Sequence, residues 1–487
     1  MSDADRLDPQ VIRVGLVVVS GAIMSILDTT IVNVALETLG RDLNAGLATI
    51  QWVITGYLLA LAIVIPITGW AVDRFGSKRV FMVSVALFVL GSGLCALAWD
   101  VYSLIAFRVL QGLGGGLLMP VGQTILVQVA GPQRVGRAMS VIGVPMLLGP
   151  ILGPVIGGVI VDNLSWQWIF LVNLPVGAVS LWVSSRVLPA DSPSGGASLD
   201  VVGLALLSPG LALLVYGLSQ AGEHRTFAAA EVWGTMIAGA ALMAAFVVHA
   251  RPIGERALIH MGYFRDRAFA AASVVVVVVS LALFGAMLLL PLYYQQVRGM
   301  DALEAGLLMA PQGLGAALAM PIAGRITDRI GARYVVMVGI VLATIGTLPF
   351  TQVTDDTSYW LLGCTLVVRG FGLGSTMMPA IAAGYSNLPV RAAGHAASAL
   401  NIFRQIGASI GTALMAVILT NHIEAPTPAA LADAFDATFW WATVITATAF
   451  VFAFALPRKV FAPRGVPIEG APTPAPGEST GPRGARA

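Results

Sequence analysis

Long apolar runs dominate the hydrophobic pattern of the chain, and short segments rich in charged or turn-forming residues separate them. A helix needs about 20 mostly apolar residues to cross the hydrocarbon core of a bilayer, and fourteen runs meet that length. We therefore predict an all-α integral membrane protein with fourteen spans. The predicted spans are 12–36, 48–72, 80–98, 101–127, 138–161, 167–188, 199–219, 230–250, 268–296, 303–326, 334–352, 358–383, 394–420 and 437–456.

One run contains six consecutive valines, Val274 to Val279, a composition that favours a strand in water. In lipid an unpaired strand would leave its backbone groups without hydrogen bonds, so we predict a helix there as well. Outside the spans lie short loops, an N-terminal segment of residues 1–11 and a tail of residues 457–487. The tail is rich in Pro, Gly and Ala, and we expect it to be disordered.

Lys and Arg are distributed unequally between the two ends of the predicted bundle. Because cytoplasmic loops of membrane proteins carry an excess of these residues, we place both termini in the cytoplasm. Of the 27 Lys and Arg, 21 then lie on the cytoplasmic side, three lie in outer loops and three lie within spans. The even number of spans agrees with this orientation.

Composition narrows the class of protein further. Only 11% of the residues are charged, whereas soluble proteins average about 25%, which excludes a soluble enzyme, a disordered scaffold and a nucleic-acid-binding protein. The net charge of +2 also gives no reason to expect a nucleic-acid partner. Both cysteines, Cys95 and Cys364, lie in apolar runs, and we predict neither a disulfide nor a metal site.

An internal repeat relates the first six spans to the last six. The segment GWAVDRFGSKR at Gly69 returns as GRITDRIGAR at Gly324, and the segment that starts at Arg108 returns at Arg369. Two six-span halves related by a repeat are typical of transporters, with the substrate site near the membrane midplane between the halves. We therefore divide the chain into an N-terminal half (12–188), two inserted spans (199–250) and a C-terminal half (268–456).

The repeated loop, G-x-x-x-D-R-x-G-x-[KR]-[KR], resembles the most specific motif of the major facilitator superfamily. LDTTIVNVAL at Leu27, QWVITGYLL at Gln51 and SWQWIFLVNLP at Ser165 are similar to signatures of its fourteen-span drug:proton antiporter branch. GPILGPVIGG at Gly149 resembles the motif of exporters within the superfamily. The resemblance covers about residues 10–457. It implies a secondary active transporter, not an enzyme, that exports small amphipathic compounds, needs no cofactor and draws its energy from the proton gradient.

The repeated loop lies at the predicted cytoplasmic ends of spans 2 and 10. A carboxylate there can accept hydrogen bonds from a helix N-terminus or from an Arg of a neighbouring helix, and basic side chains can contact helix C-termini. Such contacts break when two halves rock against each other, so we predict a conformational latch. Its residues are Gly69, Asp73, Arg74, Gly76, Lys78, Arg79, Asp328 and Arg329.

Small residues let membrane helices approach closely, and prolines kink the helix that carries them. In span 5, three glycines spaced four residues apart predict either simple close packing or a packed face that closes the outer half of the pathway and limits proton leakage. The full glycine-proline run is Gly149, Pro150, Gly153, Pro154, Gly157 and Gly158.

Asp28 is the only acidic residue deep within any predicted span, and an ionisable group at such a depth points to function. Counted from the outer ends of their spans, Asp28 and Arg108 both lie roughly 11 Å deep, so we predict that they pair or share a water chain. Pairing favours the ionised carboxyl and burial disfavours it, so the group can exchange a proton for substrate. The alternative is a fixed ion pair that only holds two helices together.

Two further arginines, Arg369 and Arg404, lie within spans that have no matching acid. Carbonyls at helix C-termini, or an anionic or zwitterionic ligand, could satisfy them. The remaining polar and aromatic residues of spans 1, 2, 4 and 13 complete the predicted substrate cavity, which consists of Asn33, Trp52, Tyr57, Gln111, Asn401, Arg404 and Gln405.

Three transport functions remain open. The first is proton-coupled export of drugs or dyes by alternating access, and the second is export of a lipid or lipid-like metabolite, which the spare arginines favour. The third, proton-coupled import of a nutrient, disagrees with the glycine-proline run. A single deep acid predicts one proton per molecule, with His395 and Glu37 as the first candidates for a second carrier. We expect a monomer in a bacterial cytoplasmic membrane, whose partners are its substrate and membrane lipids.

Overall fold

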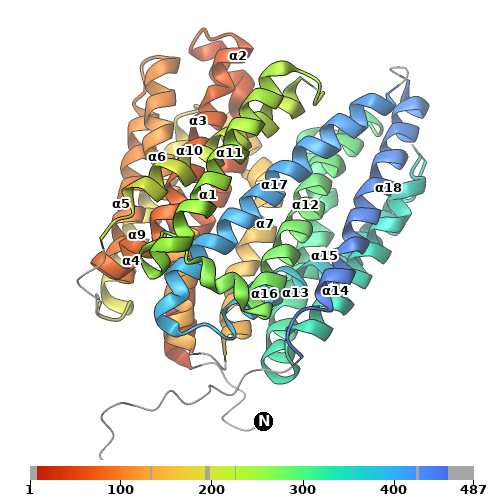
Figure 1. Cartoon of the computed structure of the whole chain (residues 1–487). Coiled ribbons are helices and arrows are strands. Elements are labelled where there is room, and N and C mark those ends of the chain that lie inside the picture. The colour runs from red at the N-terminus through yellow and green to blue at the C-terminus, as the bar shows by residue number, and fades with distance from the viewer. Residues whose placement is uncertain are drawn as a thin grey trace, which may run out of the picture.

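The computed structural model describes residues 8–131, 134–191, 198–224, 226–354, 356–423 and 427–458, and this part of the chain is helical without a β-strand (Figure 1). The helices of the first half are α1 (Pro9–Asp42), α2 (Leu47–Ile50), α3 (Trp52–Val64), α4 (Thr68–Phe75), α5 (Ser77–Ala96), α6 (Val101–Ala130), α7 (Val135–Asn163), α8 (Trp168–Leu171) and α9 (Asn173–Val187). The inserted pair is α10 (Val201–Glu223) and α11 (Ala230–Ile253). The helices of the second half are α12 (Arg267–Gln296), α13 (Ala302–Ile330), α14 (Ala332–Thr347), α15 (Tyr359–Gly374), α16 (Met377–Tyr385), α17 (Ala393–His422) and α18 (Pro428–Ala453).

The all-α membrane fold is confirmed. Among the described residues, 13 helical segments are long and apolar enough to cross a membrane. The remaining predicted span, 138–161, coincides with the continuous helix α7, so all fourteen predicted spans are helical. The valine run lies within α12, as predicted. Residues 1–7 and the predicted disordered tail from residue 459 onward lie outside the described part of the chain.

Helix boundaries differ from the prediction where local capping extends a helix beyond its apolar run. α1 begins at Pro9 because the side chain of Asp8 accepts a hydrogen bond from the Gln10 N–H, and proline is well placed at a first helical position. α18 begins at Pro428, before the predicted residue 437, because Thr427 caps it in the same way. Span 2 contains a 3₁₀ turn, η2 (Ile65–Ile67), where Pro66 lacks the N–H that an α-helix would need.

The two repeated sets of helices lie side by side, with α1–α9 on one side and α12–α18 on the other (Figure 1). Between them, α7 packs against α13, while α4 and η2 pack against α17. These two contacts are equivalent in the repeat, because α4 corresponds to the end of α13 and α7 corresponds to α17. The inserted helix α10 packs against α11, α3 and α17, so the inserted pair covers the seam between the halves on one face.

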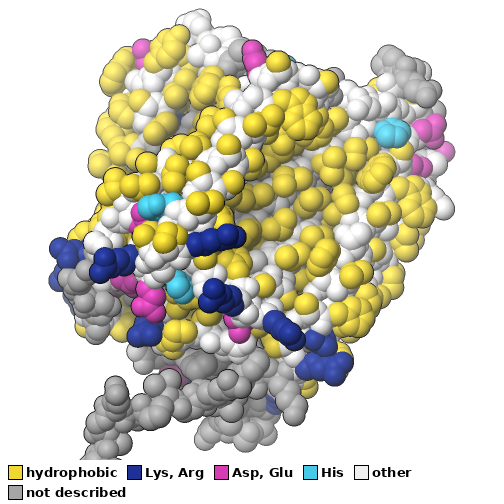
Figure 2. Space-filling model, in the orientation of Figure 1, with side chains coloured by type: hydrophobic (Ala, Val, Ile, Leu, Met, Phe, Trp, Pro, Cys, Tyr) yellow, Lys and Arg dark blue, Asp and Glu magenta, His cyan; other side chains and the backbone are white. Residues whose placement is uncertain are grey.

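We call the end of the bundle at which α1 begins and α18 ends the basic end, because most Lys and Arg gather there (Figure 2). On the face shown in Figure 2, apolar side chains cover most of the surface between the two ends. Examples are Val83, Leu90, Trp182, Val248, Leu318 and Val338, all more than half exposed. Lipid is a favourable solvent for such a surface, and this supports a multi-pass membrane protein.

Glycines bring several helices into backbone contact. A Cβ atom at Gly112 of α6 would lie 2.6 Å from the carbonyl oxygen of Tyr57 and 2.9 Å from the Cβ of Ala60, both on the span-2 helix α3. By contrast, a Cβ at the exposed Gly234 of α11 would meet nothing within 4 Å.

These two glycines give a matched pair of substitutions. Gly112→Ala should destabilise the protein by about 1–3 kcal/mol, because the added methyl group forces α3 and α6 apart. Gly234→Ala should be neutral or slightly stabilising, because alanine is the better helix former and has free space there. Thermal unfolding of the detergent-solubilised variants measures both effects, and equal melting temperatures would contradict the packing described here.

Candidate functional site

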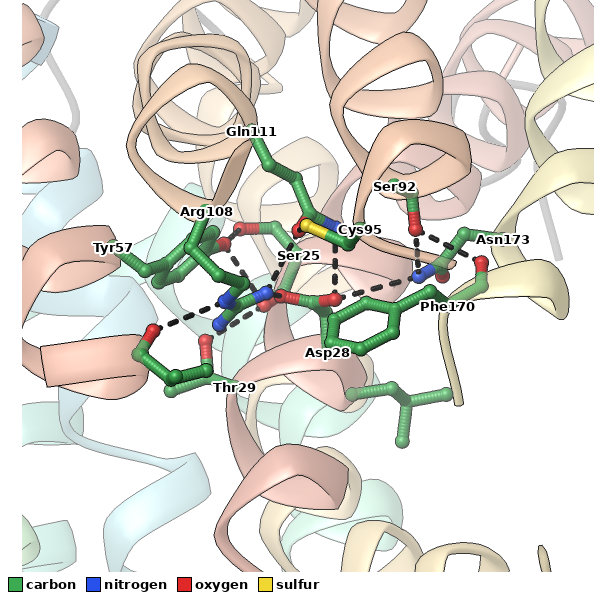
Figure 3. Close-up of polar contacts among 12 residues, drawn as sticks. Ser25, Asp28, Thr29, Tyr57, Ser92, Cys95, Arg108, Gln111, Phe170 and Asn173 are labelled. Carbon is green, nitrogen blue, oxygen red and sulfur yellow. Dashed lines mark hydrogen bonds and ion pairs between the residues drawn. The ribbon is translucent and has the colours of Figure 1, made fainter. Parts of the chain in front are cut away.

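Asp28 lies in a buried polar cluster built from α1, α3, α6 and α9 (Figure 3). The Arg108 guanidinium Nη1 lies 2.5 Å from Asp28 Oδ2, and only 1% of Asp28 and none of Arg108 is exposed. The predicted pairing of Asp28 with Arg108 is therefore present. Gln111 Nε2 donates to Asp28 Oδ1 at 2.8 Å, and Asn173 Nδ2 lies 3.4 Å from the same oxygen. Both carboxylate oxygens thus have partners.

Arg108 is held on several sides. Its Nε donates to the carbonyl oxygen of Val53 at 3.1 Å, and its Nη1 also donates to Gln111 Oε1 at 2.8 Å. The guanidinium carbon lies 4.1 Å from the centre of the Tyr57 ring, a cation–π distance. The Tyr57 hydroxyl in turn lies 3.0 Å from Ser25 Oγ. A network with this many fixed partners holds the ion pair in one geometry.

Three residues predicted to line the substrate cavity lie elsewhere. Tyr57 and Gln111 are fully buried in the Asp28 cluster, because their faces of α3 and α6 turn towards α1 rather than towards the second half. Trp52 is 42% exposed and stacks on Tyr216 of the inserted helix α10, with ring centres 5.9 Å apart. Trp52 therefore joins the inserted pair to the first half.

A cavity lies between the halves. A smaller chamber of about 160 Å³ is lined by Ser25, Thr29, Asn401, Arg404 and Gln405 among others. A larger chamber of about 630 Å³ shares Thr29, Arg404 and Gln405 and adds Asn33 and residues of the inserted helix α10. Of the residues predicted for the substrate cavity, Asn401 thus lines the smaller chamber, Asn33 lines the larger one, and Arg404 and Gln405 line both.

Ser25 and Thr29 connect the cavity to the Asp28 cluster. Both line the smaller chamber, and Ser25 also contacts the Tyr57 hydroxyl in the cluster. Gly115 leaves room for this contact, because a Cβ there would lie 2.8 Å from the Tyr57 hydroxyl and 3.2 Å from Ser25 Oγ. The hydroxyl contacts end at Tyr57, whose ring lies against Arg108, and the Asp28 carboxylate itself accepts from Arg108, Gln111 and Asn173.

The second half has an arginine equivalent to Arg108 but, in the described part of the chain, no acid paired with it as Asp28 is with Arg108. Arg369, at the repeat position of Arg108, is buried and donates to Gln312 Oε1 and to Thr347 Oγ1. Among the described residues no carboxylate contacts it. Side-chain amide and hydroxyl oxygens, rather than helix C-terminal carbonyls, therefore satisfy the guanidinium.

Two aspartates of the repeated loop bridge the halves at the basic end. Asp328 on α13 accepts hydrogen bonds from the Gly136 N–H at 2.8 Å and from Arg137 Nε at 2.7 Å, both in the first turn of α7. This is the predicted contact with a helix N-terminus and an Arg. Asp73 on α4 has a different partner, His395 Nε2 at 2.9 Å in the first turn of α17. Sequence reasoning did not foresee this partner for Asp73.

The other residues of the first loop connect elements within the N-terminal half. Lys78 Nζ donates to the carbonyl oxygens of Ser185 and Leu188 at the C-terminus of α9, as predicted for a basic residue at a helix C-terminus. The backbone N–H groups of Lys78 and Arg79 donate to Asp191, a residue that no sequence motif marked. Gly76 has a φ of 89°, which admits the sharp turn from α4 to α5. Arg74 and Arg329 lie in the last turns of α4 and α13.

The glycines of span 5 face α1 of their own half. Ile26 lies against Gly149, Thr30 lies against Gly153, and a Cβ at Gly157 would lie 3.3 Å from Ile31. Gly158 faces open space, and the side chains of Pro150 and Pro154 lie outside the described part of the structure. In this conformation the glycine face therefore packs α7 on α1 and does not close a path between the halves.

Comparison with known proteins agrees with the motifs. The chain matches the Major Facilitator Superfamily over residues 18–412. It is 46% identical over 425 residues to the multidrug resistance protein B homolog of Mycobacterium tuberculosis (strain ATCC 25618 / H37Rv), covering 86% of this chain and 79% of that protein. It is 33% identical over 402 residues to the multidrug export protein EmrB of Haemophilus influenzae, covering 82% of this chain and 78% of that protein.

Solved structures share the fold at much lower identity. The human organic anion transporter MFSD10 (TETRAN) has a TM-score of 0.63 and 18% identity, covering 92% of this chain and 100% of that chain. The proton:xylose symporter XylE has a TM-score of 0.63 and 14% identity, covering 91% of this chain and 95% of that chain. Fold, repeated loop and family match agree, and the chain belongs to the major facilitator superfamily, a family of membrane transporters.

Proposed function

We propose that this protein is a proton-coupled antiporter that exports small amphipathic compounds across the bacterial cytoplasmic membrane by alternating access. Two of its relatives are named for multidrug resistance or multidrug export. The single observation that supports the proton coupling is the buried Asp28 carboxylate, which is paired with Arg108 and lies on the helix whose Ser25 and Thr29 line the central cavity.

The proposal assigns this structure to an outward-facing state. The excess of Lys and Arg supports a cytoplasmic position for the basic end. There the halves are joined by Asp73–His395, by Asp328–Arg137 and, deeper, by Asn401 Nδ2, which donates to Gln123 Oε1 at 2.7 Å. The larger chamber instead extends towards residues near the opposite end, such as Gln51 and Ala416.

In this state a proton from the outer side can reach Asp28. Protonation makes the carboxyl neutral and removes the charge that holds Arg108, so the cluster loosens. Loss of the proton to the cytoplasm, after the halves have rocked, restores the ion pair. Each cycle then carries one proton inward for each molecule expelled. The proton gradient is the only energy source in this proposal, and no cofactor takes part.

A single chain supplies both halves of the cavity, so we propose that the protein works as a monomer. Its exposed apolar belt is in contact with membrane lipids, which are its only other partners in this account.

Substitution of the buried pair tests the coupling. Asp28→Asn should abolish gradient-driven uptake of ethidium into everted membrane vesicles, because the amide cannot bind and release a proton. Arg108→Gln should have a similar effect because it leaves the carboxylate without its counter-ion, and the double variant should be no worse than either single variant. Asp42→Asn, at the exposed end of the same helix, is the matched control. Normal ethidium transport by Asp28→Asn would refute the assignment.

The latch at the basic end should influence every cargo equally. Asp73→Ala is expected to slow the transport of chemically different dyes by the same factor, because Asp73 contacts His395 and lines no part of the central cavity. Transport rates for a series of cationic and neutral dyes measure this. A defect confined to one dye would show that Asp73 acts on cargo rather than on conformation.

Arg404 favours a second candidate for the cargo, an acidic amphiphile such as a lipid or a lipid-like metabolite. Among the described residues that line the two chambers, Arg404 is the only charged one. Its Nε donates to the neutral Asn401 Oδ1 at 3.3 Å. A cation in a cavity of low dielectric constant attracts an acidic head group more strongly than it would in water.

Rhodamine B and its ethyl ester, which differ by one carboxyl group, separate the two kinds of cargo. If acidic amphiphiles are the cargo, Arg404→Gln should reduce export of the acid relative to the ester by about tenfold, and Arg404→Lys should preserve the preference. Equal effects on both dyes would leave neutral and cationic drugs as the cargo.

A further inference from the structure

Two contacts between the halves occupy equivalent places in the repeat but differ in chemistry. Each sets an aspartate of the repeated loop against the first turn of a helix from the opposite half. Asp328 contacts Arg137, whose guanidinium stays charged at every accessible pH. Asp73 contacts His395, whose ring gains and loses a proton near neutral pH. One contact has a fixed charge, and the other can titrate.

Hydrogen-bond geometry determines how many protons the His395 contact holds. His395 Nδ1 lies 2.9 Å from the carbonyl oxygen of Leu258, which can only accept, so Nδ1 carries a hydrogen. Nε2 lies 2.9 Å from Asp73 Oδ2, and two bare acceptors would repel at that distance. A second hydrogen therefore lies between them. The closed contact holds one proton more than a neutral ring beside an ionised carboxylate.

The glycine of the loop admits this contact. A Cβ at Gly69 would lie 2.5 Å from Nδ1 and 2.7 Å from Cγ of His395, so the imidazole fills the place of the missing side chain. At the equivalent place in the other contact, a Cβ at Gly324 would lie 2.9 Å from the carbonyl oxygen of Gly136. The repeat thus keeps the close approach and changes only the partner of the aspartate.

The contact remains accessible from the basic end. It lines a cleft of about 130 Å³, and the side chains of His395 and Asp73 are 12% and 29% exposed. Acidic groups in the cleft favour a protonated ring, and basic groups nearby oppose it. The titratable and charged neighbours are Arg74 on α4, Asp200 before α10, His249 on α11 at 2.9 Å from Asp200, Glu255 and Arg256 in the linker after α11, Tyr263, and Arg391 before α17.

We propose that His395 and Asp73 form a second proton-binding site, which keeps the basic end closed only while it is occupied. When the halves separate, the ring and the carboxylate part, and the ring loses its proton wherever the pH leaves a free histidine neutral. The closed state holds one more proton, so alkaline pH at the basic end favours opening and acidic pH favours closure. The ratio of open to closed transporters changes by at most tenfold per pH unit.

This site regulates the cycle but does not add to proton coupling. Its cleft is at the basic end, so the proton returns to the side from which it came. The inference rests on the alternating access proposed above. It adds that a rise in cytoplasmic pH would itself increase the share of transporters open to load cargo.

Distance measurements between spin labels test the site. Ser185→Cys on α9 and Tyr334→Cys on α14 place exposed labels at the basic ends of opposite halves. Cys364→Ser removes the exposed native thiol, and Asp28→Asn removes the titration of the cavity site. In lipid nanodiscs, the population at the open distance relative to that at the closed distance should rise with pH between 6 and 8, by up to tenfold per pH unit.

Variants assign the pH dependence to one side chain. His395→Gln should abolish the slope, and so should Gly69→Ala, which displaces the ring by a different route. His249→Gln should retain the slope although it removes a neighbouring histidine that also faces a carboxylate. Arg137→Gln should raise the open fraction at every pH without changing the slope.

Two results would overturn the inference, namely an open fraction that does not change with pH, or a slope that survives in both His395→Gln and Gly69→Ala. Either result is compatible with the observation of both an open and a closed distance. The proposed export function would then stand. A single distance under all conditions, with ethidium included and also in the labelled protein that retains Asp28, would count against alternating access itself.

Discussion

A carboxylate buried inside a membrane protein must be paired or lose its charge, and the Asp28–Arg108 contact meets this requirement. Breaking such a pair from one side typically costs about 3–5 kcal/mol, because the remaining charge is left without a partner. The surrounding structure is arranged accordingly. Val53 and Tyr57 of α3, Gln111 of α6 and Asn173 of α9 all converge on the pair, so four helices share one polar centre. A change in the protonation of Asp28 therefore alters side-chain contacts that join four helices of the N-terminal half.

The two repeated halves have equivalent helices, but the polar contacts at equivalent positions differ. Arg108 and Arg369 occupy equivalent places, yet within the described part of the chain only Arg108 contacts an acid, and Gln312 and Thr347 accept from Arg369 instead. The loops at the basic end show the same division, with a fixed charge at Arg137 and a titratable one at His395. In the proposed mechanism, proton exchange therefore belongs to the first half, whereas the second half contributes Arg404 to the lining of the central cavity.

Positions along a helix axis could be predicted from the sequence, and directions around the axis could not. Lipid requires helices of a certain length, and the constant rise per residue placed Asp28 and Arg108 at one depth. Which way Tyr57, Gln111 and Trp52 turn depends on how α3 and α6 pack against α1 and α10, and all three were assigned to the wrong surroundings. Contacts between distant loops were equally hidden, because nothing in the motif around Asp73 indicates His395, and nothing marks Asp191 as the acceptor for the N–H groups of Lys78 and Arg79.

The central claim is that the Asp28 carboxyl carries the proton that is exchanged for cargo. Proteoliposomes loaded with ethidium in a weakly buffered medium, with no initial pH difference, test this directly. Downhill efflux of ethidium should draw about one proton inward per molecule, which an internal pH indicator records, since one acid titrates per cycle. The Asp28→Asn variant should draw none. Ethidium efflux without proton uptake in the unmodified protein, or proton uptake that persists in Asp28→Asn, would contradict the account.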